Sequence, residues 1–89
     1  MRLNVLVLLF CSTGALAQRT LGCRMPNKSL NPSPNICNAA GGTFVMINRQ
    51  PGCCTRGRDG PVVTESRFIS GCNANGGFVS GPEVLANSC

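Results

Sequence analysis

The 89-residue sequence contains no histidine, no tryptophan and no tyrosine, and it has only three acidic residues. Without histidine, a serine or cysteine nucleophile has no imidazole base to activate it, and imidazole ligation of a metal is excluded. General acid–base catalysis would depend on Asp59, Glu65, Glu83 and Lys28, which are spread over segments with loop or helix-start composition. We therefore expect a protein that is not an enzyme and that uses no cofactor or metal ion.

Aromatic rings are also scarce, because residues 18–89 contain only Phe44, Phe68 and Phe78. Sugar-binding modules commonly stack tryptophan or tyrosine on the glycan, so binding of chitin or cellulose is disfavoured. A nucleic acid is not expected as a partner either. The sequence has no run of basic residues, and it offers few rings on which bases could stack.

Long hydrophobic runs are missing as well, since a membrane-spanning helix requires roughly 20 apolar residues. The apolar run over residues 5–11 is much shorter, follows Arg2 and precedes the small residues Ala15 and Ala17. This pattern predicts a signal peptide over residues 1–17 and a secreted, extracellular mature chain over residues 18–89. Cys11 leaves with the signal peptide, so the number of cysteines becomes even.

Six cysteines remain in a mature chain of about seventy residues: Cys23, Cys37, Cys53, Cys54, Cys72 and Cys89. An even number in a short exported chain is typical of a disulfide framework. A domain of this size buries little apolar surface, so it needs such covalent links for stability. We expect three intramolecular bonds in a monomer. Of the fifteen pairings that six cysteines allow, twelve lack the strained bridge between Cys53 and Cys54.

The chain contains an internal echo. The stretch C-N-A-A-G-G-T-F-V begins at Cys37, and C-N-A-N-G-G-F-V begins at Cys72. In each case another cysteine follows at a similar distance, which suggests a pseudo-repeat of two modules, residues 23–53 and 54–89. Each module has three cysteines, so at least one disulfide must join them, and equivalent modules favour Cys23–Cys54. Chance resemblance of two short stretches is the alternative.

Local signals predict an α+β fold. Ser33 as an N-cap, Pro34 and Gly41 predict a helix over residues 34–40, and residues 65–75 form a weaker helix. Residues 43–49 are the best strand, apolar on both faces and hence central in the sheet. A second strand is predicted over residues 61–64, and a third is predicted to begin at residues 78–79.

Ser80 and Glu83 have the spacing of a capping box, which predicts a helical turn at the end of the chain. Taken together, these signals predict a small disulfide-rich single domain with a short antiparallel sheet and one or two short helices. We expect its core to hold six apolar side chains: Phe44, Val45, Ile47, Phe68, Ile69 and Phe78.

Residues 18–89 carry seven basic and three acidic side chains, a net charge of plus four. Arg56 and Arg58 are the only close pair of basic residues, and they lie in a glycine-rich loop, residues 55–60, that follows Cys54. We predict that this loop binds a protein, cell-wall or membrane-surface partner, because loops carry binding chemistry on a rigid scaffold. The alternatives are that the charge serves solubility and that the loop is only a connector.

One modification signal is present. Asn27-Lys28-Ser29 is an acceptor sequence for N-glycosylation within a loop between Cys23 and Cys37. Asn31-Pro32-Ser33 is disqualified by its proline. The sequence therefore predicts a single acceptor at Asn27.

A signal peptide, a short mature chain with six cysteines including an adjacent pair, and no catalytic residues resemble the small secreted cysteine-rich proteins of filamentous fungi. The chain differs from hydrophobins, which carry eight cysteines with two adjacent pairs. A two-fold arrangement of helix and strands would be similar to the killer-toxin-like folds of this class. The cysteine order also matches the inhibitor cystine knot, whose first-to-fourth pairing is again Cys23–Cys54, although the gaps here are much longer.

The resemblance implies a non-enzymatic effector or virulence-associated protein that binds a host or competitor macromolecule outside the producing cell. Two alternatives stay open. One is a cationic antimicrobial protein or killer-type toxin, for which the positive charge and the apolar content would matter. The other is a protease inhibitor, in which Arg56 or Arg58 would occupy a trypsin-like specificity pocket.

Overall fold

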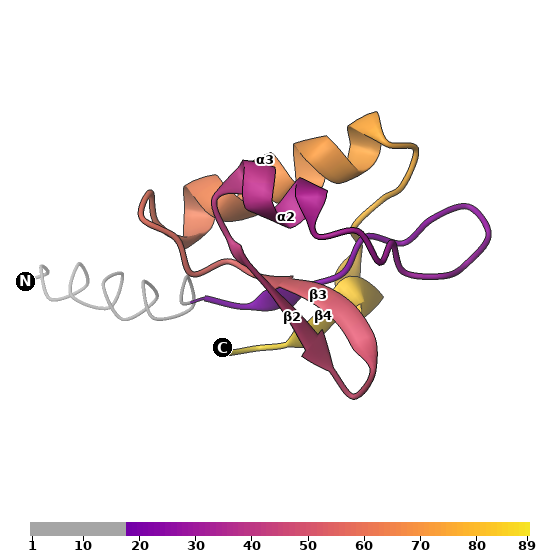
Figure 1. Ribbon diagram of the computed structural model, residues 1–89, viewed down its shortest axis with the longest axis horizontal. Coiled ribbons are helices and arrows are strands. Elements are labelled where there is room, and N and C mark those ends of the chain that lie inside the picture. Colours follow the sequence, from indigo (N-terminus) through magenta and orange to yellow (C-terminus); the bar gives the residue numbers. More distant parts are fainter. Residues whose placement is uncertain (1–17) are drawn as a thin grey trace, which may run out of the picture.

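The computed structural model describes residues 18–89, and the predicted signal peptide lies outside this range. Helices α2 (Asn35–Ala40) and α3 (Pro61–Ala74) pack against each other over one face of a four-stranded antiparallel sheet (Figure 1). The strands lie in the order β2-β3-β1-β4, and their bounds are Thr20–Leu21 (β1), Thr43–Ile47 (β2), Gln50–Cys54 (β3) and Val84–Ala86 (β4). This arrangement confirms the predicted small disulfide-rich α+β domain.

The two copies of the internal echo form the same local structure, a helix end. Gly41 ends α2 with φ of 86°, and Gly76 follows α3 with φ of 87°. The N–H of the next glycine donates to the cysteine carbonyl of the last turn in each case, Gly42 to Cys37 at 3.0 Å and Gly77 to Cys72 at 2.9 Å. This pattern is the Schellman motif, in which a left-handed glycine reverses the chain.

The predicted helix over residues 34–40 is confirmed as α2. The Ser33 hydroxyl oxygen accepts a hydrogen bond from the Asn35 N–H at 3.2 Å, as an N-cap side chain does. The strand predicted over residues 61–64 is wrong, because these residues form the first turn of α3. Pro61 occupies a position where its missing N–H costs nothing, and the Thr64 hydroxyl donates to the Gly60 carbonyl at 2.8 Å.

The weaker helix predicted over residues 65–75 belongs to the same α3. Thr64, Phe68 and Cys72 are four residues apart and form its buried face. Val62 and Val63, whose β-branched side chains favoured a strand, are instead 56% and 40% exposed. Burial of one helical face therefore overrides local β propensity in this segment.

Strand β2 is shorter than predicted and lies at the edge of the sheet, so its predicted central place is wrong. Asn48 and Arg49 have φ of 50° and 69° and form a two-residue turn between Ile47 and Gln50. Such a turn requires positive φ at both positions. Met46 in this strand is 57% exposed.

Strand β3 was not predicted, because Pro51 and Gly52 are poor strand residues. In this hairpin Met46 and Pro51 face each other as a non-hydrogen-bonded pair, so the missing N–H of Pro51 points away from β2. On β3, strand β1 pairs with Cys53 and Cys54 and does not reach Pro51. Gly52 has no space for a side chain, because a Cβ there would lie 2.6 Å from Cγ2 of Thr20.

The end of the chain differs in part from the prediction. The strand predicted at residues 78–79 is reduced to an isolated bridge between Phe78 and Arg24. The capping box of Ser80 and Glu83 is confirmed, on the 3-10 helix η2 (Gly81–Glu83). The predicted helical turn does not continue, since the following residues form β4 and pair with β1.

The disulfides are Cys23–Cys72, Cys37–Cys53 and Cys54–Cys89. The favoured pair Cys23–Cys54 is therefore wrong. Cys53 and Cys54 are neighbours on β3, so their side chains point to opposite faces of the sheet. Cys53 bonds to α2, whereas Cys54 bonds to the end of the chain.

Only the Cys23–Cys72 bond joins residues 23–53 to residues 54–89. The two modules do not pair in the same way, because Cys37 bonds within its own module and Cys72 bonds outside its own. The pseudo-repeat is therefore limited to the local helix ends.

The core lies between the helices and the sheet and is formed largely by disulfide-bonded cysteines. Cysteines make up five of the nine buried apolar residues, with Leu21, Leu30, Ala40 and Phe68 as the others. The predicted core is confirmed in part: Phe68 is buried, and the half-buried Phe44 packs against the core. Phe78 is 49% exposed, and the other three are half-buried, namely Val45, Ile47 and Ile69. The disulfides fill the space that larger side chains would otherwise occupy.

Candidate functional site

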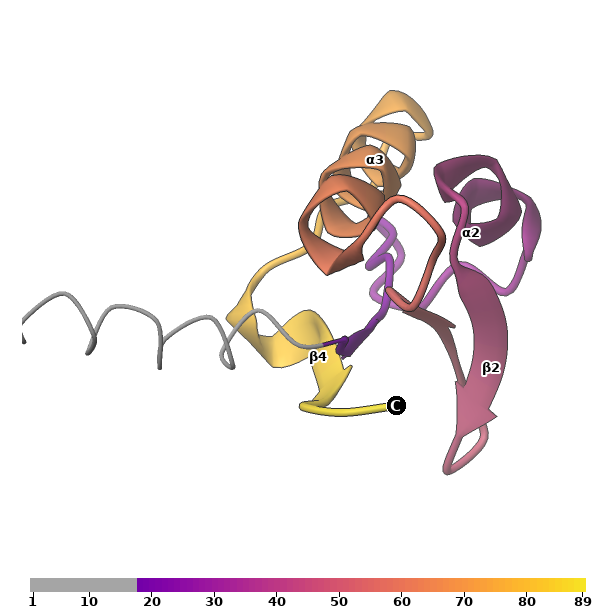
Figure 2. The ribbon, with the colours of Figure 1, turned by 90° about the vertical axis from the view of Figure 1, so that its left-hand side faces the viewer.

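The predicted binding loop connects β3 to α3, and we call residues 55–60 the arginine loop. Figure 2 looks onto the end of the molecule where this loop enters α3. Its first residue is fixed, since Thr55 is fully buried. The Thr55 N–H donates to the Arg19 carbonyl at 2.9 Å, and the Arg19 N–H donates to Oγ1 of Thr55 at 2.9 Å. The Cys54–Cys89 disulfide holds the preceding residue.

The middle of the arginine loop is also held in place. The Gly57 backbone packs so closely on α2 that a Cβ there would lie 2.5 Å from the Gly41 carbonyl oxygen. The Gly60 N–H donates to the Gly57 carbonyl at 3.1 Å and closes a turn. Oδ2 of Asp59 lies 2.7 Å from Nη1 of Arg67 on α3. The main chain of the loop is therefore anchored at both ends and in the middle.

The two arginines of the loop extend into solvent in different settings. Nη2 of Arg56 donates to the main-chain O of Cys89 at 2.8 Å, which ties the guanidinium to the end of the chain. Arg58 makes no side-chain hydrogen bond or ion pair within residues 18–89. The loop thus presents two exposed guanidinium groups on a rigid backbone, that of Arg56 positioned by a hydrogen bond and that of Arg58 without one.

All three carboxylate side chains of the protein form ion pairs with arginines. Glu65 lies 2.8 Å from Arg19, Glu83 lies 3.2 Å from Arg24, and Asp59 lies 2.7 Å from Arg67. Four basic residues have no carboxylate side chain as a partner in the described part of the chain: Lys28, Arg49, Arg56 and Arg58. The excess positive charge therefore comes from these four side chains.

Next to the arginine loop, Arg19 and Glu65 form a two-point ion pair. Nε of Arg19 donates to Oε2 of Glu65 at 3.1 Å, and Nη2 donates to Oε1 at 2.8 Å. The hydrogen bonding of the Arg19 guanidinium to Glu65 raises the pKa of Arg19 above its ordinary value. The negative charge of Glu65 is balanced by the positive charge of Arg19, so it does not offset the charge of Arg56 and Arg58 in the loop.

The carboxylates do not form a shared acid–base site, since each contacts its own arginine. Within residues 18–89 no group of three cysteine or carboxylate side chains could hold a metal ion. None of the helices in this range is long and apolar enough to cross a bilayer.

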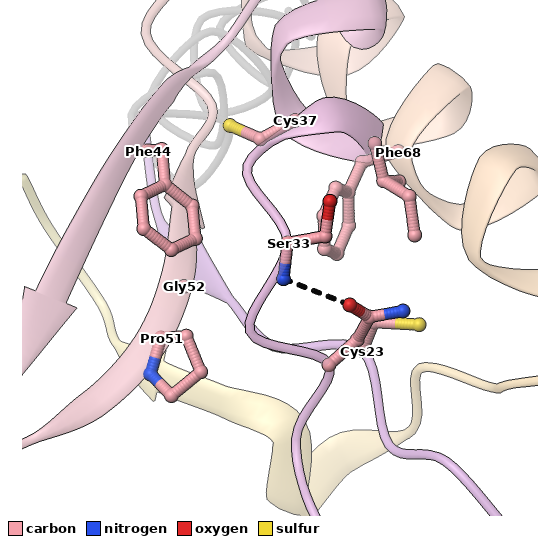
Figure 3. Close-up of a pocket in the computed structure, with 9 residues that line it drawn as sticks. Cys23, Ser33, Cys37, Phe44, Pro51, Gly52 and Phe68 are labelled. Atoms are coloured by element: carbon pink, nitrogen blue, oxygen red, sulfur yellow. Dashed lines mark hydrogen bonds between the residues drawn. The ribbon is translucent and has the colours of Figure 1, made fainter.

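Hollows of different size lie among residues 18–89. The crevice in Figure 3 lies between α2, α3 and the hairpin, beside Phe44 and Phe68, and its volume is about 10 Å³. That is room for about one water molecule. A more open groove of about 290 Å³ lies between α2 and α3. Its Arg67 is paired with Asp59, and the Asn75 amide donates to the Gly71 carbonyl at 2.7 Å.

Asn27, the predicted glycosylation site, is exposed. The loop of residues 24–30, which contains it, lies at the other end of the molecule from the arginine loop (Figure 1). Two features of the arginine loop are not predicted from the sequence: its anchor at Arg19 and the exposed Val62 and Val63 that follow it. The pair Gly60-Pro61 is typical of a helix start and could have placed these valines on a helix surface.

No protein family, curated protein or solved structure matches this chain.

Proposed function

We propose that this protein is a non-enzymatic secreted effector or virulence-associated protein that binds an anionic host or competitor macromolecule outside the producing cell. The arginine loop is the proposed contact surface. One observation carries the proposal: a loop with a fixed main chain presents Arg56 and Arg58, while every carboxylate side chain is bound to another arginine. Three disulfides are typical of small proteins that work outside the cell.

A rigid loop supports binding because little conformational entropy is lost when a partner arrives. The buried Thr55, the close packing of Gly57 and the Asp59–Arg67 ion pair supply this rigidity. Arginine also suits the role chemically, since its planar guanidinium forms two-point hydrogen bonds with phosphate, sulfate or carboxylate groups. The loop therefore fits an anionic partner better than an apolar one.

The membrane-active toxin is a second candidate, and one observation favours it. Val62 and Val63 are exposed directly after the arginine loop, so apolar and cationic side chains lie next to each other in sequence. The protease inhibitor is less favoured. A protease binds its peptide in an extended form, whereas Arg58 lies inside the turn that the Gly60 N–H closes onto the Gly57 carbonyl.

The test compares two double variants that remove the same charge from different places. Arg56→Ala with Arg58→Ala removes both basic side chains from the arginine loop, and Lys28→Ala with Arg49→Ala removes two basic side chains elsewhere. Heparin serves as the soluble anionic probe. Each basic side chain near an anionic surface contributes about 1 kcal/mol, so the loop variant should bind about 30-fold more weakly at low salt. The difference should shrink at high salt because of screening.

Both variants should retain their thermal stability, because exposed substitutions usually cost within about 0.5 kcal/mol. Equal weakening in the two double variants would show that only net charge matters and would remove the loop from the proposal. Failure of the wild-type protein to bind heparin at low salt would contradict an anionic partner. Leakage of dye from anionic phospholipid vesicles, measured in parallel, would favour the toxin over the effector.

A further inference from the structure

We propose that Asn27 carries an N-linked glycan, at the end of the molecule opposite to the arginine loop. This inference concerns a modification and does not depend on the proposed function. Asn27, Lys28 and Ser29 are exposed and lie in the loop between Arg24 and Leu30, which are joined by an antiparallel bridge. Figure 1 shows this loop projecting from the body, far from the segment that enters α3.

The hydrogen bonds of Asn27 identify which atom of its side-chain amide is free to carry a glycan. Its Oδ1 accepts from the Ser29 N–H at 3.0 Å and from the Ser29 hydroxyl at 2.7 Å. A main-chain N–H can only donate, so the atom facing it must be the amide oxygen. The amide nitrogen Nδ2 therefore points away from this turn, and it makes no hydrogen bond within residues 18–89.

A glycan is joined to Nδ2, so both hydrogen bonds of Oδ1 persist in the modified protein. The rest of the loop also forms without Nδ2. The Met25 N–H donates to the Ser29 carbonyl, and the Lys28 N–H donates to the Met25 carbonyl, each at 2.8 Å. Nη1 of Arg24 donates to the Lys28 carbonyl at 2.8 Å. The folded loop thus accommodates a glycan in solvent without losing any of its own contacts.

Asn31 provides an internal comparison a few residues away. It precedes Pro32, which blocks the acceptor motif. Its Oδ1 accepts from the Ser33 N–H at 2.9 Å, and its Nδ2 donates to Sδ of Met25 at 3.6 Å. Asn31 is half-buried, so its amide is engaged on both sides. Of the two Asn-x-Ser triplets in this loop region, only the first has an available nitrogen.

The three disulfides place the folding chain in an oxidising secretory compartment, where N-glycosylation also takes place. The donor is a lipid-linked oligosaccharide diphosphate. Nδ2 forms a bond to the anomeric carbon of the first sugar, and the bond from that carbon to the diphosphate oxygen breaks. The lipid diphosphate leaves with the electron pair, and the Nδ2 proton passes to a base of the transferase.

The test uses the full chain expressed in a eukaryotic secretion host. The intact mass of the product reports the disulfides and the glycan together. We expect a glycosylated species that loses its glycan on treatment with peptide N-glycosidase, which converts Asn27 to Asp in the peptide map. Asn27→Gln and Ser29→Ala should each abolish the glycan. Ser29→Thr should retain it, because threonine completes the same acceptor motif.

Asn31 in the same peptide map should stay unmodified. A wild-type product that has three disulfides and no glycan would overturn the proposal, because the chain has then passed through the compartment without modification. A glycan that persists in Asn27→Gln or Ser29→Ala would also overturn it. If one variant is not recovered, the wild-type mass and the other variant decide the question.

Discussion

At the scale of single residues, Gly42 and Gly77 allow the backbone to pack directly against disulfide sulfur atoms. A Cβ on Gly42 would lie 2.6 Å from Sγ of Cys53 and 2.7 Å from the Cys54 carbonyl oxygen. A Cβ on Gly77 would lie 2.8 Å from Sγ of Cys23. In each Gly-Gly pair the first glycine allows the left-handed turn, and the second lets the backbone contact a disulfide. This double requirement gives the internal echo a physical reason.

We expect Gly42→Ala and Gly77→Ala to lower the free energy of unfolding by about 1–3 kcal/mol each, because an added methyl group overpacks against fixed sulfur and backbone atoms. Gly81→Ala is the matched control, since a Cβ there meets nothing within 4 Å. The control should change stability by less than about 0.5 kcal/mol. Urea unfolding with the disulfides intact measures all three. Equal stability of Gly42→Ala and Gly81→Ala would show that the close contact is unimportant.

At the scale of elements, Glu83 joins η2 to the loop that carries Asn27. Its carboxylate accepts from the Ser80 N–H at 3.0 Å, from the Ser80 hydroxyl, and from Nε of Arg24 at 3.2 Å. Arg24 in turn donates to the Lys28 carbonyl, so one buried carboxylate positions both segments. These hydrogen bonds, that of the Ser80 hydroxyl first, lower the pKa of Glu83 below its ordinary value of 4.5, although burial opposes the shift.

A lowered pKa in the folded state makes stability depend on pH in a defined direction. The contribution of Glu83 is complete above its unfolded pKa of about 4.5 and is lost as the pH falls through the lower folded pKa. Glu83→Gln should therefore cost about 1–2 kcal/mol near neutral pH and much less in strong acid. Urea unfolding at about pH 7 and about pH 3 measures the difference.

Asp59→Asn is the control for this experiment, because the exposed Asp59–Arg67 pair should contribute less than about 1 kcal/mol at either pH. The same pH dependence in Glu83→Gln and in the wild-type protein would contradict the role given to this carboxylate.

At the scale of the whole molecule, the disulfides connect every layer of the fold. Cys37–Cys53 links α2 to the hairpin of β2 and β3. Cys23–Cys72 links the segment after β1 to α3, and Cys54–Cys89 links β3 to the end of the chain. Cys89 is exposed, whereas the other five cysteines are at most 4% exposed. A thiolate in solution can therefore reach Cys54–Cys89 most easily.

We expect mild reduction to open this bond first, giving a species with two alkylated cysteines, Cys54 and Cys89. This species should be less stable by about 4 kcal/mol in the chain-entropy model, because the bond closes a loop of 35 residues. Peptide mapping after timed alkylation and urea unfolding of the intermediate measure both effects. Alkylation of Cys23 or Cys72 before Cys89 would contradict the order.

The sequence alone identified those features that depend on neighbouring residues. The helix over residues 34–40, its end at Gly41 and the capping box of Ser80 and Glu83 follow from local hydrogen bonding. The six cysteines in so short a chain predicted a disulfide-rich domain, because little else could stabilise it. The glycines around Arg56 and Arg58 likewise indicated an exposed loop.

Only the tertiary structure decided the disulfide pairing, the composition of the core and the setting of the arginine loop. The opposite directions of Cys53 and Cys54 depend on β3, which forms because β2 and β1 pair with it despite Pro51. Thr55 is anchored by a residue 36 positions away, and Glu65 and Glu83 find their arginines 46 and 59 positions away. Such contacts are absent from the sequence pattern, because they arise only when burial and chain closure bring distant segments together.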